Sequence, residues 1–259
     1  MPRTVASRSR AARSSERTKA QFLDAAEKVF GSHGYEGTTI RAIARIAGVN
    51  LGTLQHYWGS KRQLFRDLFK LRFEPLKQET LRRLQSIEQR ARAGHAPRAE
   101  EILRALIETT FLLGVDMPQG AADGEGGAAL RQFHRLYGRA LMDPSPVVIS
   151  EVIRTFKQPV ELTLKLMREA CPQLDAAELD WRLNCIIGSQ VFSMVYSERI
   201  GVFFGPEADV APRRAAQWII HFLLNGVDAA PYAPGGTTSR NEDAATRPSE
   251  RRAAHPRPR

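Results

Sequence analysis

The chain of 259 residues has few cysteines and no long apolar run. Its two cysteines, Cys171 and Cys185, form neither a disulfide framework nor a CxxC metal motif. They fit a reducing compartment as small core side chains, and a redox pair is the alternative. Polar residues interrupt even the apolar stretch at 183–204, so no segment reaches the roughly 18 apolar residues of a membrane span. We therefore expect a cytoplasmic protein with no membrane partner.

Signatures of enzymes are also missing from the sequence. There is no glycine-rich phosphate loop, no GxSxG and no HExxH. The histidines His56, His134 and His221 are scattered, and no carboxylate pair accompanies them at the spacing of metal ligands. The sequence therefore predicts no catalytic activity, no metal and no cofactor.

Positive charge is abundant and concentrated near the N-terminus. The net charge is +10, and residues 1–62 hold eleven Lys and Arg against four Asp and Glu, which accounts for +7 of it. Such a concentration is typical of a surface that meets phosphate or another anionic partner. A basic surface that serves only solubility would give the same charge.

Apolar residues recur at helical spacing almost throughout the chain. Phe22, Ala25, Ala26, Val29 and Phe30 form one stripe of a first helix, and a shorter stripe around Ile43 forms a second helix that stops at Gly48. Later helices are predicted at about 61–92, 98–114, 128–142, 146–170, 176–202 and 209–228, with bends at Pro75 and Pro159. No alternating strand pattern is long enough for a sheet, so the predicted fold is all-α.

A short helix lies within AGVNLGTLQHYWGSK, residues 47–61. With Asn50 as its N-cap and 100° per residue, Leu54 and Trp58 fall on one edge, which should face the core. The opposite face is polar and nearly bare, with Gly52 and His56 at its centre, Thr53 and Gln55 on its flanks, and Leu51 and Tyr57 at its borders.

Such a face suits the DNA major groove. Gly52 costs about 1 kcal/mol of helix propensity relative to Ala, which is easier to understand if the backbone must approach a partner closely. The turn at 47–49 permits the sharp angle of a helix-turn-helix. Thr39 and Lys61, each at the start of a helix, could bind phosphate.

Residues 20–69 resemble the DNA-binding domain of the TetR family of one-component transcriptional regulators. The resemblance rests on the first stripe, Gly34-Tyr35, Thr38-Thr39, Ala47-Gly48-Val49, Gly52, Tyr57-Trp58 and Lys61 with Leu64-Phe65. The residues assigned to DNA contact are Thr39, Arg41, Asn50, Leu51, Gly52, Thr53, Gln55, His56, Tyr57 and Lys61. Many relatives have Tyr at the position of Gln55 and often a basic residue at Leu51. Here Gln55 could reach adenine and Leu51 a thymine methyl, so the operator sequence stays open.

We expect four segments: a disordered basic arm at 1–14, a helix-turn-helix domain at 15–75, a helical domain at 76–230, and a disordered tail at 231–259. The resemblance implies that the domain at 76–230 binds a ligand and dimerises. The tail is rich in Pro, Gly, Ser and charge and has little to bury. The last two helices are apolar on more than one face, which favours a two-fold four-helix interface over burial within one chain.

The larger domain resembles, more weakly, a TetR subgroup that includes fatty-acid-responsive regulators, through RLYGRAL and CPQLDAAELDWR. That resemblance implies an apolar effector such as a fatty acid or acyl derivative. Residues that could line its pocket, or equally form ordinary core, are Phe111, Phe133, Tyr137, Met142, Phe156 and Met167.

The sequence thus predicts a ligand-responsive repressor that binds a palindromic double-stranded DNA operator as a homodimer and leaves it on binding a small effector. The alternative is a non-specific architectural protein that compacts DNA through its basic ends. The two differ in that a repressor keeps a site preference when salt weakens background binding.

Overall fold

The computed structural model describes residues 5–112, 125–195, 202, 204–205 and 210–232. In these ranges the regular structure is entirely helical, as predicted, and no helix among them is long and apolar enough to cross a membrane. The helices are α1 (Val5–His33), α2 (Ile40–Ala47), α3 (Leu51–Trp58), α4 (Lys61–Arg92), α5 (Ala99–Leu112), α6 (Glu125–Met142), α7 (Pro146–Ala170), α8 (Ala176–Val195) and α10 (Pro212–Val227).

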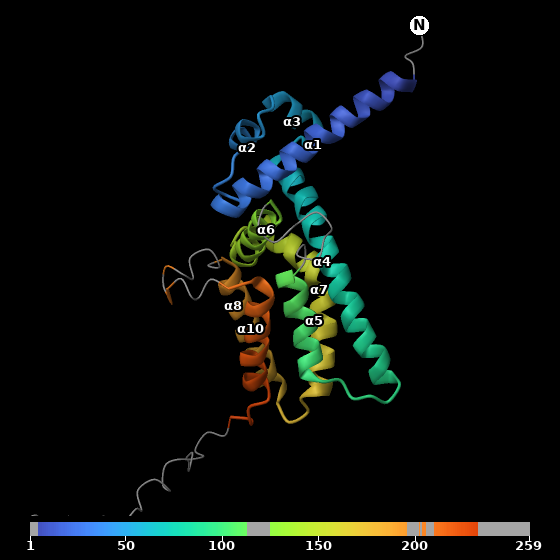
Figure 1. The fold of residues 1–259 in the computed structure, drawn as a ribbon, viewed down its shortest axis with the longest axis vertical. Helices are drawn as coiled ribbons and strands as arrows, with labels where there is room; N and C mark the ends of the chain where they lie inside the picture. The colour runs from blue at the N-terminus through green and yellow to red at the C-terminus, as the bar shows by residue number, and fades with distance from the viewer. Residues whose placement is uncertain (1–4, 113–124, 196–201, 203, 206–209, 233–259) are drawn as a thin grey trace, which may run out of the picture.

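The helices form a small head and a larger body (Figure 1). The head consists of α1, α2, α3 and the first turns of α4. With 32 residues, α4 is about 48 Å long and runs from the head along the body. In the body α5 packs between α4 and α10, while α7 packs against α4. Helix α6 packs against both α1 and α8, so it joins the head to the body.

The head is built around the stripe that the sequence predicts. Phe22, Ala25, Ala26, Val29 and Phe30 of α1 are all buried. They share one apolar cluster with residues of α2, α3 and α4, in which aromatic rings meet edge to face, as Phe30 and Phe65 do at a centroid distance of 5.0 Å. Ring pairs of this geometry add about 0.5–1.5 kcal/mol beyond their burial, so the head has a rigid centre.

Helix α1 begins earlier than predicted. The sequence indicates a disordered arm at residues 1–14, but the helix starts at Val5. The segment is rich in Ala and Arg, which are strong helix formers, and it extends a helix already fixed by the buried stripe, so each added residue avoids the cost of nucleation. The predicted tail falls, beyond Tyr232, outside the described residues, as do most of the loop at 115–127 and the end of the helix predicted at 176–202.

Two helices continue through a proline. Pro75 lies inside α4 and Pro159 inside α7. Each proline removes one backbone donor, yet neither helix ends there, because both pack along their length against other helices of the body.

The body has its own apolar cluster, with a few buried polar groups beside it. His134 of α6 is 5% exposed, and its Nε2 donates a hydrogen bond to the carbonyl oxygen of Thr110 on α5 at 3.2 Å. Burial lowers the pKa of His134 to about 4, since the charged imidazolium would lose its hydration. One turn later, burial raises the pKa of Tyr137 to about 12. These groups are neutral parts of the core at physiological pH.

The buried His134 should make stability depend on pH. Its folded pKa of about 4 lies below the ordinary 6.5, so the unfolded chain binds a proton more readily between these values. Stability is therefore complete above pH 6.5 and is lost as the pH falls towards 4, by about 3 kcal/mol for this residue. We expect His134→Gln, which keeps an Nε2 donor without titrating, to lack this component in urea unfolding at pH 7, 5.5 and 4.

His56→Gln is the matched control, because His56 is exposed. Its unfolding free energy should follow that of the parent chain at each pH. Parallel curves for His134→Gln and the parent would show that His134 takes up its proton without cost in the fold.

Candidate nucleic-acid interface

Helix α3 is defined by a tight turn and a side-chain cap. Gly48 ends α2 with φ +65°, in the left-handed region that favours glycine, and three residues later α3 begins. Asn50 is the predicted N-cap, and its Oδ1 accepts a hydrogen bond from the Gly52 amide at 2.7 Å. Thr39 caps α2 in the same way, accepting from the Ala42 amide at 3.1 Å. The pair therefore has the helix-turn-helix form that the sequence predicts.

One edge of α3 anchors it to the head. Leu54 is fully buried and Trp58 is 8% exposed. The Trp58 ring meets Phe22 of α1 at a centroid distance of 5.7 Å, and its Nε1 donates to Asp67 of α4 at 3.1 Å. These contacts from two helices fix both the position and the rotation of α3.

The opposite edge of α3 is open to solvent. Gly52, Gln55 and His56 are exposed, and Thr53 is half-buried. A Cβ built on Gly52 would meet only Asn50 Oδ1, at 3.3 Å. Gly52 has no left-handed φ, and the cap oxygen of Asn50 is the one described atom close to its Cβ position, so the solvent side of this backbone is open. An α-helix with such an edge fits the DNA major groove, which is about 12 Å wide.

Two further residues assigned to DNA contact lie on or beside α2. Thr39 and Arg41 are both exposed, although the Thr39 hydroxyl already serves as a cap. Asn50 is exposed next to α3 and is likewise used as a cap.

The other three assigned residues have contacts inside the head. Leu51 is half-buried against the apolar cluster. Tyr57 is also half-buried, and its hydroxyl lies 2.9 Å from Ser15 Oγ of α1. Lys61 donates to the carbonyl oxygen of Tyr35 at 3.0 Å and lies 3.8 Å from Glu36. Each of these side chains thus helps to hold parts of the head together, which helical periodicity alone does not indicate.

The residues predicted to line an effector pocket are only partly brought together. Phe133, Tyr137 and Phe156 surround Phe73 of α4, with ring centroids 5.5 to 6.0 Å from it. Phe111 instead meets His134, at 5.7 Å, and Met167 is fully buried in the body's cluster. Met142 is 68% exposed at the end of α6, so it joins neither the rings around Phe73 nor the body's cluster.

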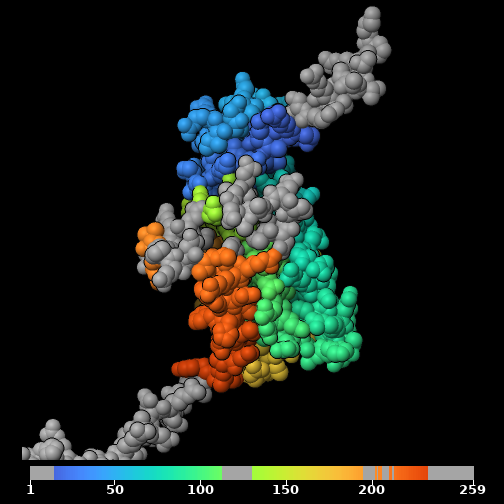
Figure 2. Space-filling view, viewed as in Figure 1, coloured from blue at the N-terminus to red at the C-terminus, as the bar shows by residue number. Residues whose placement is uncertain are grey.

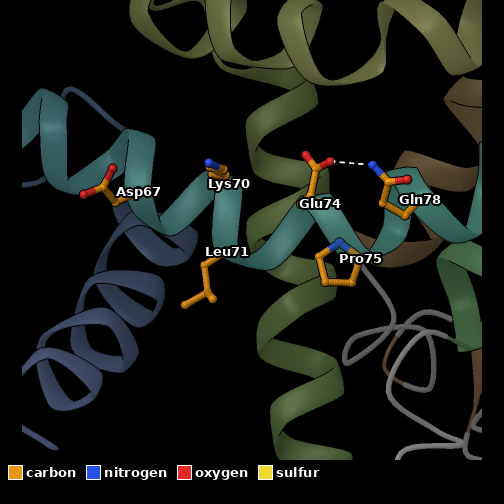
Figure 3. A pocket seen from close by; sticks show the side chains of 6 residues that line it. All are labelled: Asp67, Lys70, Leu71, Glu74, Pro75 and Gln78. Carbon is orange, nitrogen blue, oxygen red and sulfur yellow. Dashed lines mark hydrogen bonds between the residues drawn. The ribbon is translucent and has the colours of Figure 1, made fainter. Parts of the chain in front are cut away.

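A hollow of about 570 Å³ lies elsewhere, on one face of α4 (Figure 3). Its lining residues all come from that helix: Asp67, Lys70, Leu71, Glu74, Pro75 and Gln78. Gln78 donates to Glu74 at 2.6 Å, which lowers the pKa of that carboxyl group. None of the six predicted pocket residues borders this hollow, and in the described ranges no three His, Cys, Asp or Glu side chains gather as metal ligands.

Polar contacts tie the head to the end of α6. The Tyr35 amide, in the turn after α1, donates to Asp143 Oδ2 at 2.9 Å, and Ser145 Oγ donates to Glu36 at 3.0 Å. A side chain at Gly34, which has φ +70°, would also place its Cβ 3.0 Å from Asp143 Oδ2. This junction was not predicted from the sequence. The sequence shows only an Asp-Pro-Ser turn directly after a predicted helix, which indicates the turn but not its contact with the head.

A second polar junction lies between the long helices. Arg72 of α4 donates to Glu27 at 2.7 Å and to Asp24 at 2.8 Å, both on α1. Burial raises the pKa of Glu27, and the neighbouring Arg72 opposes that rise. Because Glu27 is only 3% exposed, removing Arg72 would leave a buried carboxylate without its partner.

Two family models match the chain. Residues 22–68 match the N-terminal domain described as bacterial regulatory proteins of the tetR family. Residues 117–226 match a tetracyclin repressor-like C-terminal domain. The first match spans the head from the α1 stripe to α4, and the second covers most of the body.

Similar proteins support the same assignment. The repressor AcnR of Corynebacterium efficiens is 35% identical over 48 residues, or 18% of this chain and 26% of AcnR. The regulator BetI of Burkholderia mallei is 33% identical over 93 residues, or 36% of this chain and 44% of BetI. The chain thus spans less than half the length of these relatives. Among solved structures, the fatty acid degradation regulator FadR of Bacillus halodurans superposes with a TM-score of 0.50 at 20% identity, covering 82% of this chain and 96% of FadR, which shows a shared fold.

The helix-turn-helix head, the helical body and both family models agree. AcnR and BetI are transcriptional regulators rather than enzymes, as the sequence predicts for this chain. The chain belongs to the TetR family of bacterial transcriptional regulators.

Proposed function

We propose that this regulator is a repressor that binds a palindromic DNA operator as a homodimer and leaves it when a small apolar effector enters the body. The observation that carries the proposal is the exposed polar edge of α3, with Gly52 bare at its centre and Leu54 and Trp58 anchoring the other side. Gln55, His56 and Thr53 would read base edges, while Thr39 and Arg41 of the α2 region would meet phosphates.

Dimerisation is supported by apolar side chains left exposed on α8 and α10. Trp181 is 70% exposed, Phe192 58%, Trp218 52% and Phe222 73%. Figure 2 shows α10 lying open on this face of the body. Large exposed apolar groups on adjacent helices mark an interaction surface, and a two-fold pairing would bury them in a four-helix interface. Two heads could then address half-sites about 34–36 Å apart.

Effector response is supported by the way α6 joins the two parts. The helix carries Phe133 and Tyr137 in the aromatic group around Phe73, and Asp143 directly after its end holds the Tyr35 amide of the head. An apolar ligand that displaces α6 would therefore move the head. A coupling of about 1–3 kcal/mol between the two sites would change DNA affinity about 5- to 150-fold.

Acyl compounds are the effector class to test first. The aromatic group around Phe73 is apolar and joins α4, α6 and α7, and FadR, which shares the fold, is named for fatty acid degradation.

The proposal is tested by selecting bound sites from random duplexes and then screening effectors. We expect a palindrome whose half-sites lie about one helical turn apart. Members of a series of free fatty acids and acyl-coenzyme A esters of increasing chain length should then release the selected duplex in a mobility-shift assay. Bound duplexes without a shared motif would favour an architectural protein that binds DNA non-specifically. A palindrome that no acyl compound releases would contradict the effector class alone.

Two substitutions on α3 test its role in binding. Gly52→Ala should weaken affinity for the selected duplex roughly tenfold or more, because a methyl group would enter the closest part of the contact, and His56→Ala should do the same by removing a polar group. Gly52→Ala should leave the free energy of unfolding within about 1 kcal/mol of the parent, or raise it, since Ala is the better helix former.

Gln85→Ala is the matched control, an exposed position on the distant part of α4. Its DNA affinity, measured by fluorescence anisotropy, should equal that of the parent. Unchanged affinity in both α3 variants would rule out α3 as the reading helix, and a matching loss of stability would make these residues structural.

A single charge should separate the dimer. Phe222→Asp places a carboxylate at the centre of the proposed interface, so we expect monomers of unchanged helix content in sedimentation velocity. Leu71→Asp changes an equally apolar side chain, 50% exposed on α4, and should remain dimeric. A Phe222→Asp variant that sediments with the Leu71→Asp variant as a dimer would show that the chains pair elsewhere.

A further inference from the structure

Helix α1 reaches well beyond the part that builds the head. From Ser15 onwards its first buried residue is Phe22, where the family match also begins, but the helix starts at Val5. Residues 5–14 alone add about 15 Å of helix. Figure 1 shows this end of α1 running out past α3, away from the body. We call residues 5–21 the α1 extension.

The α1 extension is attached to the reading helix itself. Ser15 Oγ lies 2.9 Å from the hydroxyl of Tyr57, in the last turn of α3. Lys19 Nζ lies 5.5 Å from the centre of the same Tyr57 ring, within the range of a cation–π contact. The extension therefore leaves the head directly beside the helix proposed to enter the major groove.

The α1 extension is strongly basic. Its sequence contains Arg8, Arg10, Arg13, Arg17 and Lys19, and the one acidic residue is Glu16. Lys19 pairs with Glu16 at 3.2 Å, and five basic residues against one acidic residue give the segment a formal charge of +4. Positions 10, 13 and 17 follow helical spacing, so they lie on one face of the backbone helix. A row of positive charge of this length matches the regular phosphates of a duplex, which carry one charge per about 1.7 Å.

The composition of the α1 extension argues against other anionic partners. A helix that lies on a membrane surface needs a face of Trp, Phe or Leu, and residues 5–21 contain none of these. A helix that packs on another protein needs an apolar stripe, but Val5 and four alanines are the only apolar residues here. Phosphate contact requires no apolar face.

We propose that the α1 extension binds the phosphate backbone of the duplex next to the segment read by α3, and so lengthens each half-site. This inference rests on the proposed reading role of α3. The contact adds affinity without sequence information, because phosphates are alike at every base pair. It also assigns Tyr57 a second role, since its hydroxyl and ring hold the extension against α3.

The test replaces Arg10, Arg13 and Arg17, which share that face, with Gln, which keeps helix propensity and removes three charges per chain. The control replaces Arg240, Arg247 and Arg251 of the C-terminal segment with Gln, so both variants have the same net charge. Binding to the selected duplex is measured from about 50 to 200 mM KCl, the range over which phosphate contacts weaken strongly. Two duplexes are used, one trimmed to the palindrome and one extended on both sides by about half a helical turn.

For the Arg10, Arg13 and Arg17 variant we expect the salt slope to decrease by about 0.9 for each phosphate that is no longer neutralised, and by up to about 5 for a dimer. Its affinity should no longer depend on the flanking base pairs, while the preference for the palindrome over a scrambled duplex persists. The control should keep the slope of the parent and the gain in affinity from flanking DNA.

A variant that matches the control on both duplexes would overturn the inference while leaving the repressor proposal intact. A parent chain with no preference for the palindrome would overturn the repressor proposal and, with it, the inference. Deleting residues 2–14 provides a second variant, which removes Arg10 and Arg13 together with the helix that carries them and should also give a smaller salt slope than the parent.

Discussion

The burial of one edge of α3 is the constraint on which the rest of the structure depends. A helix of eight residues is too short to be stable alone, so its position comes entirely from its contacts. Leu54 and Trp58 make these contacts. The Trp58 side chain packs against Phe22 of α1 and donates a hydrogen bond to Asp67 of α4. The head can therefore present Gly52 and His56 to a partner as a fixed surface, and binding DNA would not require α3 to become ordered first.

A movement in the body would reach the head because the two parts are joined by a shared helix and by hydrogen bonds and ion pairs. Helix α4 belongs to both parts. Asp143 accepts a hydrogen bond from the turn after α1, and Arg72 binds α1 itself through Glu27. Buried charged contacts of this kind tolerate few alternative arrangements, since Glu27 loses its partner if α1 and α4 slide apart. A shift of α6 would thus pass to the head as a movement of a whole unit, which would change the spacing of the two reading helices in the proposed homodimer.

Local features were predictable from the sequence, whereas contacts between distant residues were not. The α1 stripe, the caps Thr39 and Asn50, and the buried Leu54 and Trp58 follow from helical spacing and from side chains that bond to neighbouring amides. The bonds from Ser15 to Tyr57 and from Tyr35 to Asp143 join residues 42 and 108 positions apart, and no periodicity encodes them. For the same reason the sequence alone groups Met142 with aromatic residues that it does not meet. The start of α1 was not predictable because an arginine-rich composition suits both a solvated arm and a helix.

In the proposed complex, the exposed edges of the two α3 helices lie in the major groove about one helical repeat apart. Methylation protection on the selected duplex tests this arrangement directly, because dimethyl sulfate methylates guanine N7 in the major groove and adenine N3 in the minor groove. We expect two clusters of protected N7 atoms, with centres about 10 base pairs apart, and unprotected adenine N3 atoms between them. Full methylation of N7 throughout a bound duplex, or a single protected cluster, would contradict the claim.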